Sequence, residues 1–386
     1  MRRAAVRRPL VTCLRSACAA LVSMAAIPAA MAQDSPWESQ TEAGTGVIVN
    51  DNALLGRRGQ FVGQKVTDYA NVLRLRNESG YRLGRNTRLV GIGEATILGF
   101  RSREELRSAD FLLDVSLERG IGDTARVIPE LAAVYHPEAS SDWSFWLVRP
   151  ALRVELPPLA GLLTDIRYEF SWQDFSGDAP RLTFGNLDNR GHRGEVRLRY
   201  WLRNDWRLAL TYRIDVFTFS SNLLWSDPPL AAFVGLPEGT ERRDITNMAQ
   251  PEVSYVAGDS LVLTLGYRFE DSRSNSADFT YRAHRVVGAG YWEITDRHIV
   301  FAEVRYGRYD FHSFQFDSRY RNTRSDLRLD VAANYRFVLN DHFYLQARYG
   351  LLSNDSNDSS DFNPGTSLSF STFSQNRFEF LGVATF

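Results

Sequence analysis

Alternation of apolar and polar residues constrains this chain more than any other feature of its sequence. From Asp326 to Phe337, apolar residues occupy every second position, while Asp, Arg and Asn dominate the positions between them. Successive side chains of a β-strand point to opposite faces, so this segment would have one apolar face and one charged face. On a helix the same residues would scatter charge around the whole circumference. The segment is therefore predicted to be a strand.

The same pattern recurs along the chain in segments of roughly ten residues, the length expected of membrane-spanning strands. Clear examples cover residues 195–200, 206–215, 261–270 and 343–350. No apolar run of about 18 residues follows residue 32, so a transmembrane helix is excluded there. Only a closed β-barrel could then cross a membrane with every backbone polar group paired. A secreted β-sandwich also alternates, but the features described next favour the barrel.

The connections between these segments fall into two alternating classes. Tight turns are expected at residues 84–86, 120–123, 204–205, 258–259, 295–296 and 340–341, where Gly, Asn and Asp are frequent. Longer polar connections are expected at residues 51–66, 176–190, 220–247, 271–282, 310–322 and 354–374. Two connections fit less well, since residues 137–142 are short for an outer loop and residues 156–162 are apolar for an inner turn. Short periplasmic turns and long extracellular loops are typical of outer-membrane barrels, here an all-β, up-and-down barrel of about 16 strands.

The first 32 residues are predicted to be a cleaved signal peptide, which leaves residues 33–386 as the barrel. Several arginines precede an apolar stretch at residues 19–28, and Ala30, Met31 and Ala32 form the cleavage site. Both cysteines lie in this segment, so the mature chain has no disulfide. The formal charge of the whole chain is −1, and loss of those arginines makes the remainder more acidic. Nucleic acid is therefore excluded as a main partner.

The last nine residues, from Phe378 to Phe386, end the chain on an aromatic side chain. This segment resembles the closing strand of outer-membrane proteins, and the resemblance implies that the barrel assembly machinery recognises Phe386. From Asp326 onward the chain also resembles the β-barrel porins found beside exopolysaccharide or surface-export genes. That resemblance implies the same fold and an export role with periplasmic polysaccharide-export proteins as partners. Lipids of the outer membrane, including lipopolysaccharide, are the remaining expected partners.

A barrel of about 16 strands is wide enough to enclose an aqueous channel. Charges on the inward face could select ions by sign, or could pair across strands and keep the wall hydrated and rigid. The residues predicted to line the pore are Arg74, Arg76, Arg153, Asp165, Glu169, Glu195, Arg197, Arg199, Arg213, Glu303, Arg305, Asp326, Arg328, Asp330 and Arg348.

These features predict an outer-membrane channel that passes small polar solutes, or an exit conduit for an exported polysaccharide. The alternative is a structural or assembly barrel with a plugged lumen, acting in surface-protein or envelope biogenesis. The apolar centre of the connection at residues 220–247, with Trp225 and Phe233, keeps that alternative open.

No catalytic site, metal or cofactor is predicted. The six histidines show no triad or metal-ligand spacing, and His312 and Ser313 would point to opposite faces of a strand. Asp355, Asp358 and Asp361 resemble a calcium loop, but the sequence lacks the glycine and the final glutamate that an EF-hand requires. A hydrated loop is the simpler interpretation.

Overall fold

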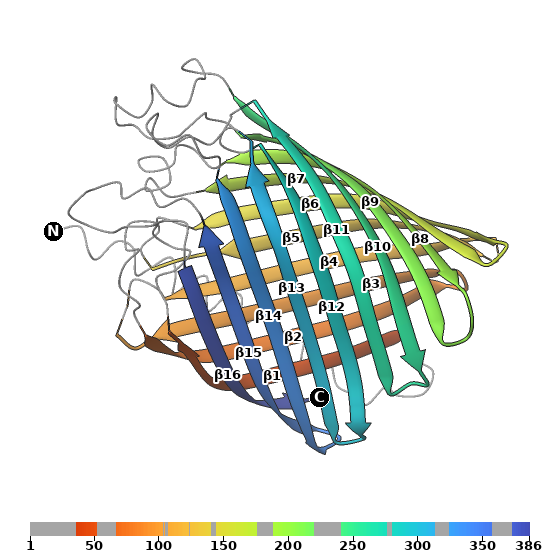
Figure 1. Ribbon diagram of the computed structural model, residues 1–386. Coiled ribbons are helices and arrows are strands. Elements are labelled where there is room, and N and C mark those ends of the chain that lie inside the picture. Colours follow the sequence, from red (N-terminus) through yellow and green to blue (C-terminus); the bar gives the residue numbers. More distant parts are fainter. Residues whose placement is uncertain are drawn as a thin grey trace, which may run out of the picture.

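The computed structural model shows that the chain forms one closed, antiparallel β-barrel of 16 strands. Figure 1 shows the strands tilted steeply as they wind around the barrel. The structure describes residues 36–51, 67–102, 104, 107–122, 124–139, 144–175, 188–219, 241–275, 280–312, 324–356 and 373–386. The predicted signal peptide at residues 1–32 lies outside this part of the chain. No helix in the described part is long and apolar enough to cross a membrane.

The strands have 12 to 17 residues. They are β1 Trp37–Asn50, β2 Asp68–Gly84, β3 Thr87–Phe100, β4 Ser108–Ile121, β5 Ala125–His136, β6 Phe145–Leu159, β7 Leu162–Phe175, β8 Asn189–Trp201, β9 Trp206–Phe219, β10 Arg242–Ala257, β11 Leu261–Ser274, β12 Tyr281–Thr295, β13 His298–Phe311, β14 Ser325–Asn340, β15 Phe343–Ser356 and β16 Phe373–Thr385.

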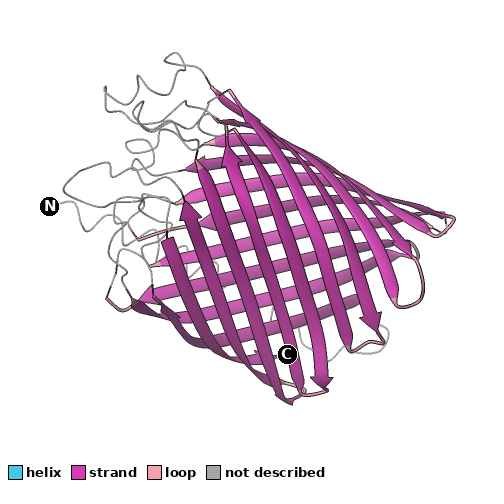
Figure 2. Cartoon of the chain, viewed as in Figure 1, coloured by secondary structure: helices cyan, strands magenta, loops and turns pink. Residues whose placement is uncertain are grey.

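Every strand pairs with its neighbours in sequence, and β1 pairs with β16 to close the sheet. The closing ladder runs from the pair Glu42 and Thr385 to the pair Asn50 and Arg377. Backbone hydrogen bonds in both directions between Thr41 and Phe386 extend this ladder to the last residue. Figure 2 shows strand around the whole circumference of the barrel. No strand edge is left unpaired, which is what a membrane-spanning sheet requires.

Short turns and long connections alternate, as the sequence predicts. Two connections fitted this alternation poorly in the sequence, but both follow it in the structure. The first, at residues 137–144, joins β5 to β6 on the side of the long connections. At the opposite end, β6 and β7 are joined by a two-residue turn whose Ala160 and Gly161 have positive φ angles of 49° and 83°. The apolar residues around this turn are therefore strand, and only Ala160 and Gly161 leave it.

Several predicted connections are too long; the one at residues 271–282, for example, includes four residues of β11 and two of β12. Residues 242–247 belong to β10, so the expected loop at residues 220–247 ends earlier. The strand continues because Arg242 and Asp244 alternate with outward side chains in the same period as the rest of β10. The apolar centre around Trp225 and Phe233 lies outside the described residues.

Candidate functional site: the luminal wall

The outer face of the barrel is apolar. Leu113, Leu131, Leu265, Tyr306 and Phe380 stand on the outward positions of five different strands, and each is exposed. Large exposed side chains of this kind would be unfavourable in water, whereas hydrocarbon accommodates them. The outward positions of the strands therefore form the surface that a lipid bilayer would cover.

Aromatic side chains gather at both ends of this face. At the short-turn end, Trp206 packs on Tyr255 with ring centroids 5.1 Å apart. At the other end, Tyr135 stacks on Trp146 at 4.0 Å. Such aromatic belts mark the two interfaces of a bilayer, where a ring sits between hydrocarbon and water.

Each residue predicted to line the pore occupies an inward position of its strand, opposite in parity to the outward apolar residues. In β8, for instance, Glu195, Arg197 and Arg199 alternate with the outward Val196 and Leu198. This placement follows from the two-residue period of a strand.

Seven charged side chains on strands β5 to β9 form one continuous chain of ion pairs, called here the luminal charge ladder. Oppositely charged atoms of successive members lie 2.6 to 3.4 Å apart. Its members, in order around the wall, are Arg153, Glu130, Arg167, Glu169, Arg193, Asp215 and Arg213. Positive and negative side chains alternate along it, so most of its charge is compensated within the wall.

Four members of the ladder were absent from the predicted pore-lining set: Glu130, Arg167, Arg193 and Asp215. Strand parity could have found them. Arg167, for example, lies between Asp165 and Glu169 on the same inward face. Two of the six contacts join residues two positions apart on one strand, whereas the other four join different strands and could not be read from any single strand.

A second set of pairs lines β11 to β14. Glu270 contacts both Arg268 and Arg285. Arg305 contacts Glu303 at 2.7 Å and Asp330 at 3.2 Å. Two of these pairs lie within one strand and two connect adjacent strands, so the charged wall continues beyond the ladder.

Asp326 of β14 is buried and binds two arginines. Its carboxylate lies 2.6 Å from Arg324 and 3.1 Å from Arg328. The side chain has no exposed surface, so the two arginines replace the hydration that its charge would have in water.

The other predicted residues are also close to partners. Arg199 lies 2.7 Å from Asp165, and Arg197 lies 3.6 Å from Glu252. Arg74 contacts Glu379 at 2.7 Å, and Arg76 contacts Glu94 at 3.3 Å. Arg348 stands opposite Glu379 in the β15–β16 register, and Glu195 lines a luminal cavity described below.

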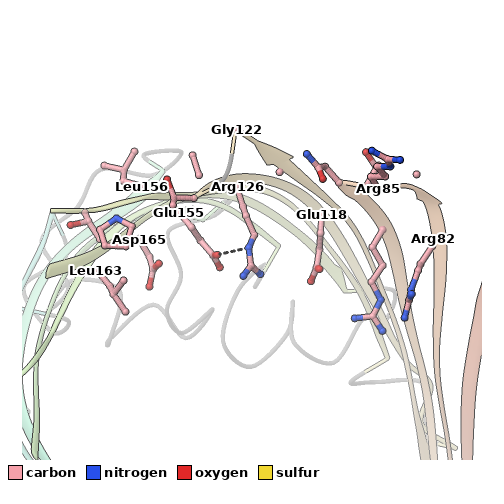
Figure 3. Close-up of a pocket in the computed structure, with 18 of the residues that line it drawn as sticks. Arg82, Arg85, Glu118, Gly122, Arg126, Glu155, Leu156, Leu163 and Asp165 are labelled. Carbon is pink, nitrogen blue, oxygen red and sulfur yellow. Dashed lines mark ion pairs between the residues drawn. The ribbon is translucent and has the colours of Figure 1, made fainter. Parts of the chain in front are cut away.

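Two hollows follow the inner side of β2 to β8. The larger has a volume of about 840 Å³ at the short-turn end, between Arg82, Arg88, Glu118 and Arg126 on one side and Arg199 on the other. Figure 3 shows charged side chains of this rim, including Arg126 and Glu155, pointing inward from the wall. The smaller, of about 300 Å³, lies deeper against the luminal charge ladder. Asp165 lines both, so the two hollows share one wall. The space is polar and bordered by both signs of charge.

Part of the inner wall is apolar, which the sequence did not predict. Near the junction of β1 and β16, buried side chains pack together in what is called here the seam cluster. Its members are Ile48, Ala70, Val72, Phe100, Tyr344, Leu381 and Val383, with Leu98 and Val338 packed against them. In β3, several outward positions are glycines and several inward positions are apolar. Gly91, Gly93 and Gly99 face outward, whereas Val90, Ile92 and Leu98 face inward.

One described histidine sits between two carboxylates at the long-connection end of the lumen. His136 places Nδ1 2.5 Å from Asp110 and Nε2 3.2 Å from Glu138. Both ring nitrogens are engaged, so neither is free to accept a proton from a serine hydroxyl. Among the described residues no group of three His, Cys, Asp or Glu side chains has metal-binding geometry. Asp355 lies at the end of β15, and Asp358 and Asp361 lie outside the described residues.

Comparisons with known proteins leave the family open. No family model matches the chain, and no curated protein matches it. Similar solved structures include a loop-deletion mutant of OmpT, an outer membrane protein of Vibrio cholerae, with 10% identity, a TM-score of 0.48, and coverage of 91% of this chain and 100% of that chain. An anion-selective porin from Comamonas acidovorans shows 11% identity, a TM-score of 0.46, and coverage of 91% and 99%. OccAB3 of Acinetobacter baumannii shows 9% identity, the same TM-score of 0.46, and coverage of 91% and 99%. Because each TM-score is below 0.5, we take the function of this chain from its own geometry.

Proposed function

We propose that this protein is an outer-membrane channel for small polar solutes. The observation that carries this proposal is a closed barrel whose outer face is apolar and whose inner wall bears paired charges beside polar hollows. Barrels of 16 strands are wide enough to enclose water. The short turns then lie on the periplasmic side and the long connections on the cell surface.

The luminal charge ladder explains how such a wall would treat a solute. Alternating arginines and carboxylates produce strong local fields but a small net charge, so polar molecules would find partners of both signs. Apolar molecules would have to displace water from the charged wall without replacing its hydrogen bonds, which is unfavourable. Ion preference should therefore be modest.

The proposal is tested by recording single-channel conductance of the refolded protein, residues 33–386, in a planar bilayer. Steady conductance with modest ion preference is expected. The triple variant R197E/R199E/R328E should then move the reversal potential toward cations. The triple variant R197K/R199K/R328K, which keeps the charge, is the matched control and should leave that potential nearly unchanged. A barrel that folds but does not conduct would contradict the channel and favour the structural or assembly barrel.

The same preparation distinguishes an exit conduit for polysaccharide from a channel for small solutes. Small neutral sugars should permeate proteoliposomes, and neutral polymers wider than the pore should not. Dependence of transport on added periplasmic polysaccharide-export proteins would instead support the conduit. The proposed channel needs no catalysis. The conducting protein is therefore expected to hydrolyse neither lipid nor peptide.

A further inference from the structure

The outer face carries the same group of side chains twice, on β7–β8 and on β11–β12. In the first copy, His192 lies across the strand pair from Phe170, with ring centroids 5.2 Å apart. The Tyr168 hydroxyl lies 2.7 Å from Nδ1 of the same histidine. Since Tyr168 and Phe170 are on one face of β7, they hold the imidazole ring from two sides.

The second copy has the same register. His284 lies across from Phe269, again with centroids 5.2 Å apart, and the Tyr267 hydroxyl lies 2.5 Å from its Nδ1. In both copies the tyrosine occupies Nδ1 and thereby leaves Nε2 for another partner. A repeated arrangement at equivalent strand positions indicates more than ordinary aromatic packing.

Each histidine is accompanied by an arginine two positions earlier on the same outward face. Arg190 precedes His192, and Arg282 precedes His284. Their side chains are 62% and 54% exposed, at a rim of the outer face that also carries the charged Arg273, Arg308 and Asp310. Because β8 and β12 begin at the long-connection end, both arginines lie on the water side of the aromatic rings.

The carboxylates next to Arg190 and Arg282 leave part of the hydrogen-bonding capacity of these two arginines unused. Glu241 lies 3.5 Å from Arg190, a loose pair between two exposed groups. Asp271 is shared between Arg282 and the highly exposed Arg273, at 3.0 Å from each. A guanidinium group has five N–H donors, and one carboxylate uses at most two of them.

We propose that these two clusters bind phosphate groups of an anionic glycolipid in the outer leaflet, that is, of lipopolysaccharide. An exposed guanidinium at the interface offers paired donors that match a phosphate, and the oriented imidazole adds a further donor. The aromatic rings below would contact the sugar and the first acyl carbons. This inference rests on the outer-membrane placement given under the proposed function, but not on an open pore.

A third copy of the aromatic part acts as a control within the same chain. His298 lies across from Phe337, at 5.0 Å between ring centroids, and 2.7 Å from the Tyr335 hydroxyl. It lies at the short-turn end of the barrel, and the residue two positions earlier is Asp296. The aromatic scaffold thus occurs at both ends, whereas the arginine occurs only at the end that would face the glycolipid.

The test is binding of lipid to the refolded full barrel in detergent, measured by native mass spectrometry. The probes are lipid A with both phosphates, dephosphorylated lipid A and phosphatidylglycerol. The wild type is expected to bind phosphorylated lipid A on the order of tenfold more tightly than the dephosphorylated form, and more tightly than phosphatidylglycerol. The double variant R190Q/R282Q should lose most of that difference, and R190K/R282K should retain part of it. Y335F, at the other end, should bind like the wild type.

Equal binding of the phosphorylated and dephosphorylated forms, or full binding by R190Q/R282Q, would overturn the proposal. Equally tight binding of phosphatidylglycerol would replace a glycolipid site with a general anion site and would also overturn it. Heat-modified electrophoretic mobility verifies that each variant is folded. Conductance of R190Q/R282Q should equal that of the wild type, so a silent channel with intact lipid binding would contradict only the proposed function.

Discussion

The two halves of the inner wall are stabilised in different ways. On β5 to β9, the luminal charge ladder links the strands through alternating arginines and carboxylates. Around the junction of β1 and β16, the wall is lined instead by the apolar seam cluster. One ion pair, between Arg74 and Glu379, crosses the cluster region from β2 to β16.

This difference reflects how far apart in sequence the paired strands lie. β5 to β9 are joined one after another by single connections, so their contacts form at little entropic cost. The β1–β16 ladder brings together the two ends of the barrel sequence, which costs more chain entropy. Apolar burial is non-directional and is not weakened by charge screening, so it is a suitable means of stabilising this closure.

The largest effect is expected at Gly46 of β1, where a methyl group would separate the two strands that close the barrel. A Cβ atom at this position would overlap the carbonyl oxygen of Phe380 in β16. G46A should therefore abolish the heat-resistant, fast-migrating folded form on electrophoresis, because the backbone would have to move to remove this overlap. G350A is the matched control, since a Cβ at this inward glycine of β15 meets no atom within 4 Å. Normal folding of G46A would show that the seam tolerates displacement.

A smaller but still large effect is expected at Asp326, in the charged half. D326N removes the partner of Arg324 and Arg328 at a site with no exposed surface, and should cost about 3 kcal/mol of unfolding free energy. D330N is the control on the same strand, because Asp330 is 43% exposed and its ion pair is with the half-exposed Arg305. It should cost under about 1 kcal/mol. Urea unfolding followed by tryptophan fluorescence measures both, and equal losses would contradict the role of burial.

The ion pair of Arg74 with Glu379 at the seam should contribute more to the free energy of unfolding than the pair of Arg76 with Glu94 in the open lumen. R74M leaves the buried Glu379 carboxylate without its 2.7 Å partner and should cost about 2 kcal/mol. R76M disrupts a half-exposed pair with Glu94 and should cost about 0.5 kcal/mol. The second loss should shrink further when urea unfolding is repeated at about 1 M salt. A larger loss for R76M than for R74M would reverse the comparison.

The smallest expected effect is on ion selectivity. R167Q leaves Glu130 and Glu169 without their shared arginine and should raise the cation-to-anion permeability ratio on the order of twofold. L98Q, at an apolar position beside the seam cluster, changes no charge and should leave the reversal potential as it is. An equal shift in both variants would mean that selectivity does not depend on the ladder.

Much of the fold could be predicted from local pattern. Alternation in segments such as residues 326–337 identified strands and their charged faces, and Gly, Asn and Asp in the tight turns led to the prediction of about 16 strands, of which the structure has 16. Loop boundaries were less certain, because the alternation of β10 begins at Arg242, inside an expected loop. The seam cluster was missed because every apolar face was assigned to the outside, an assumption that fails where glycines occupy the outward positions of β3.

By itself, the sequence determined which side chains share a face of each strand, because the two-residue period is a local property of the backbone. It also determined the alternation of short and long connections, since turn chemistry is local as well. Only the tertiary structure decided which charges neutralise one another and which residues meet at the closure. Arg74 and Glu379, 305 residues apart, become partners across β1 only when the sheet closes at a particular register. Register and closure depend on all 16 strands together, so no single segment could reveal them.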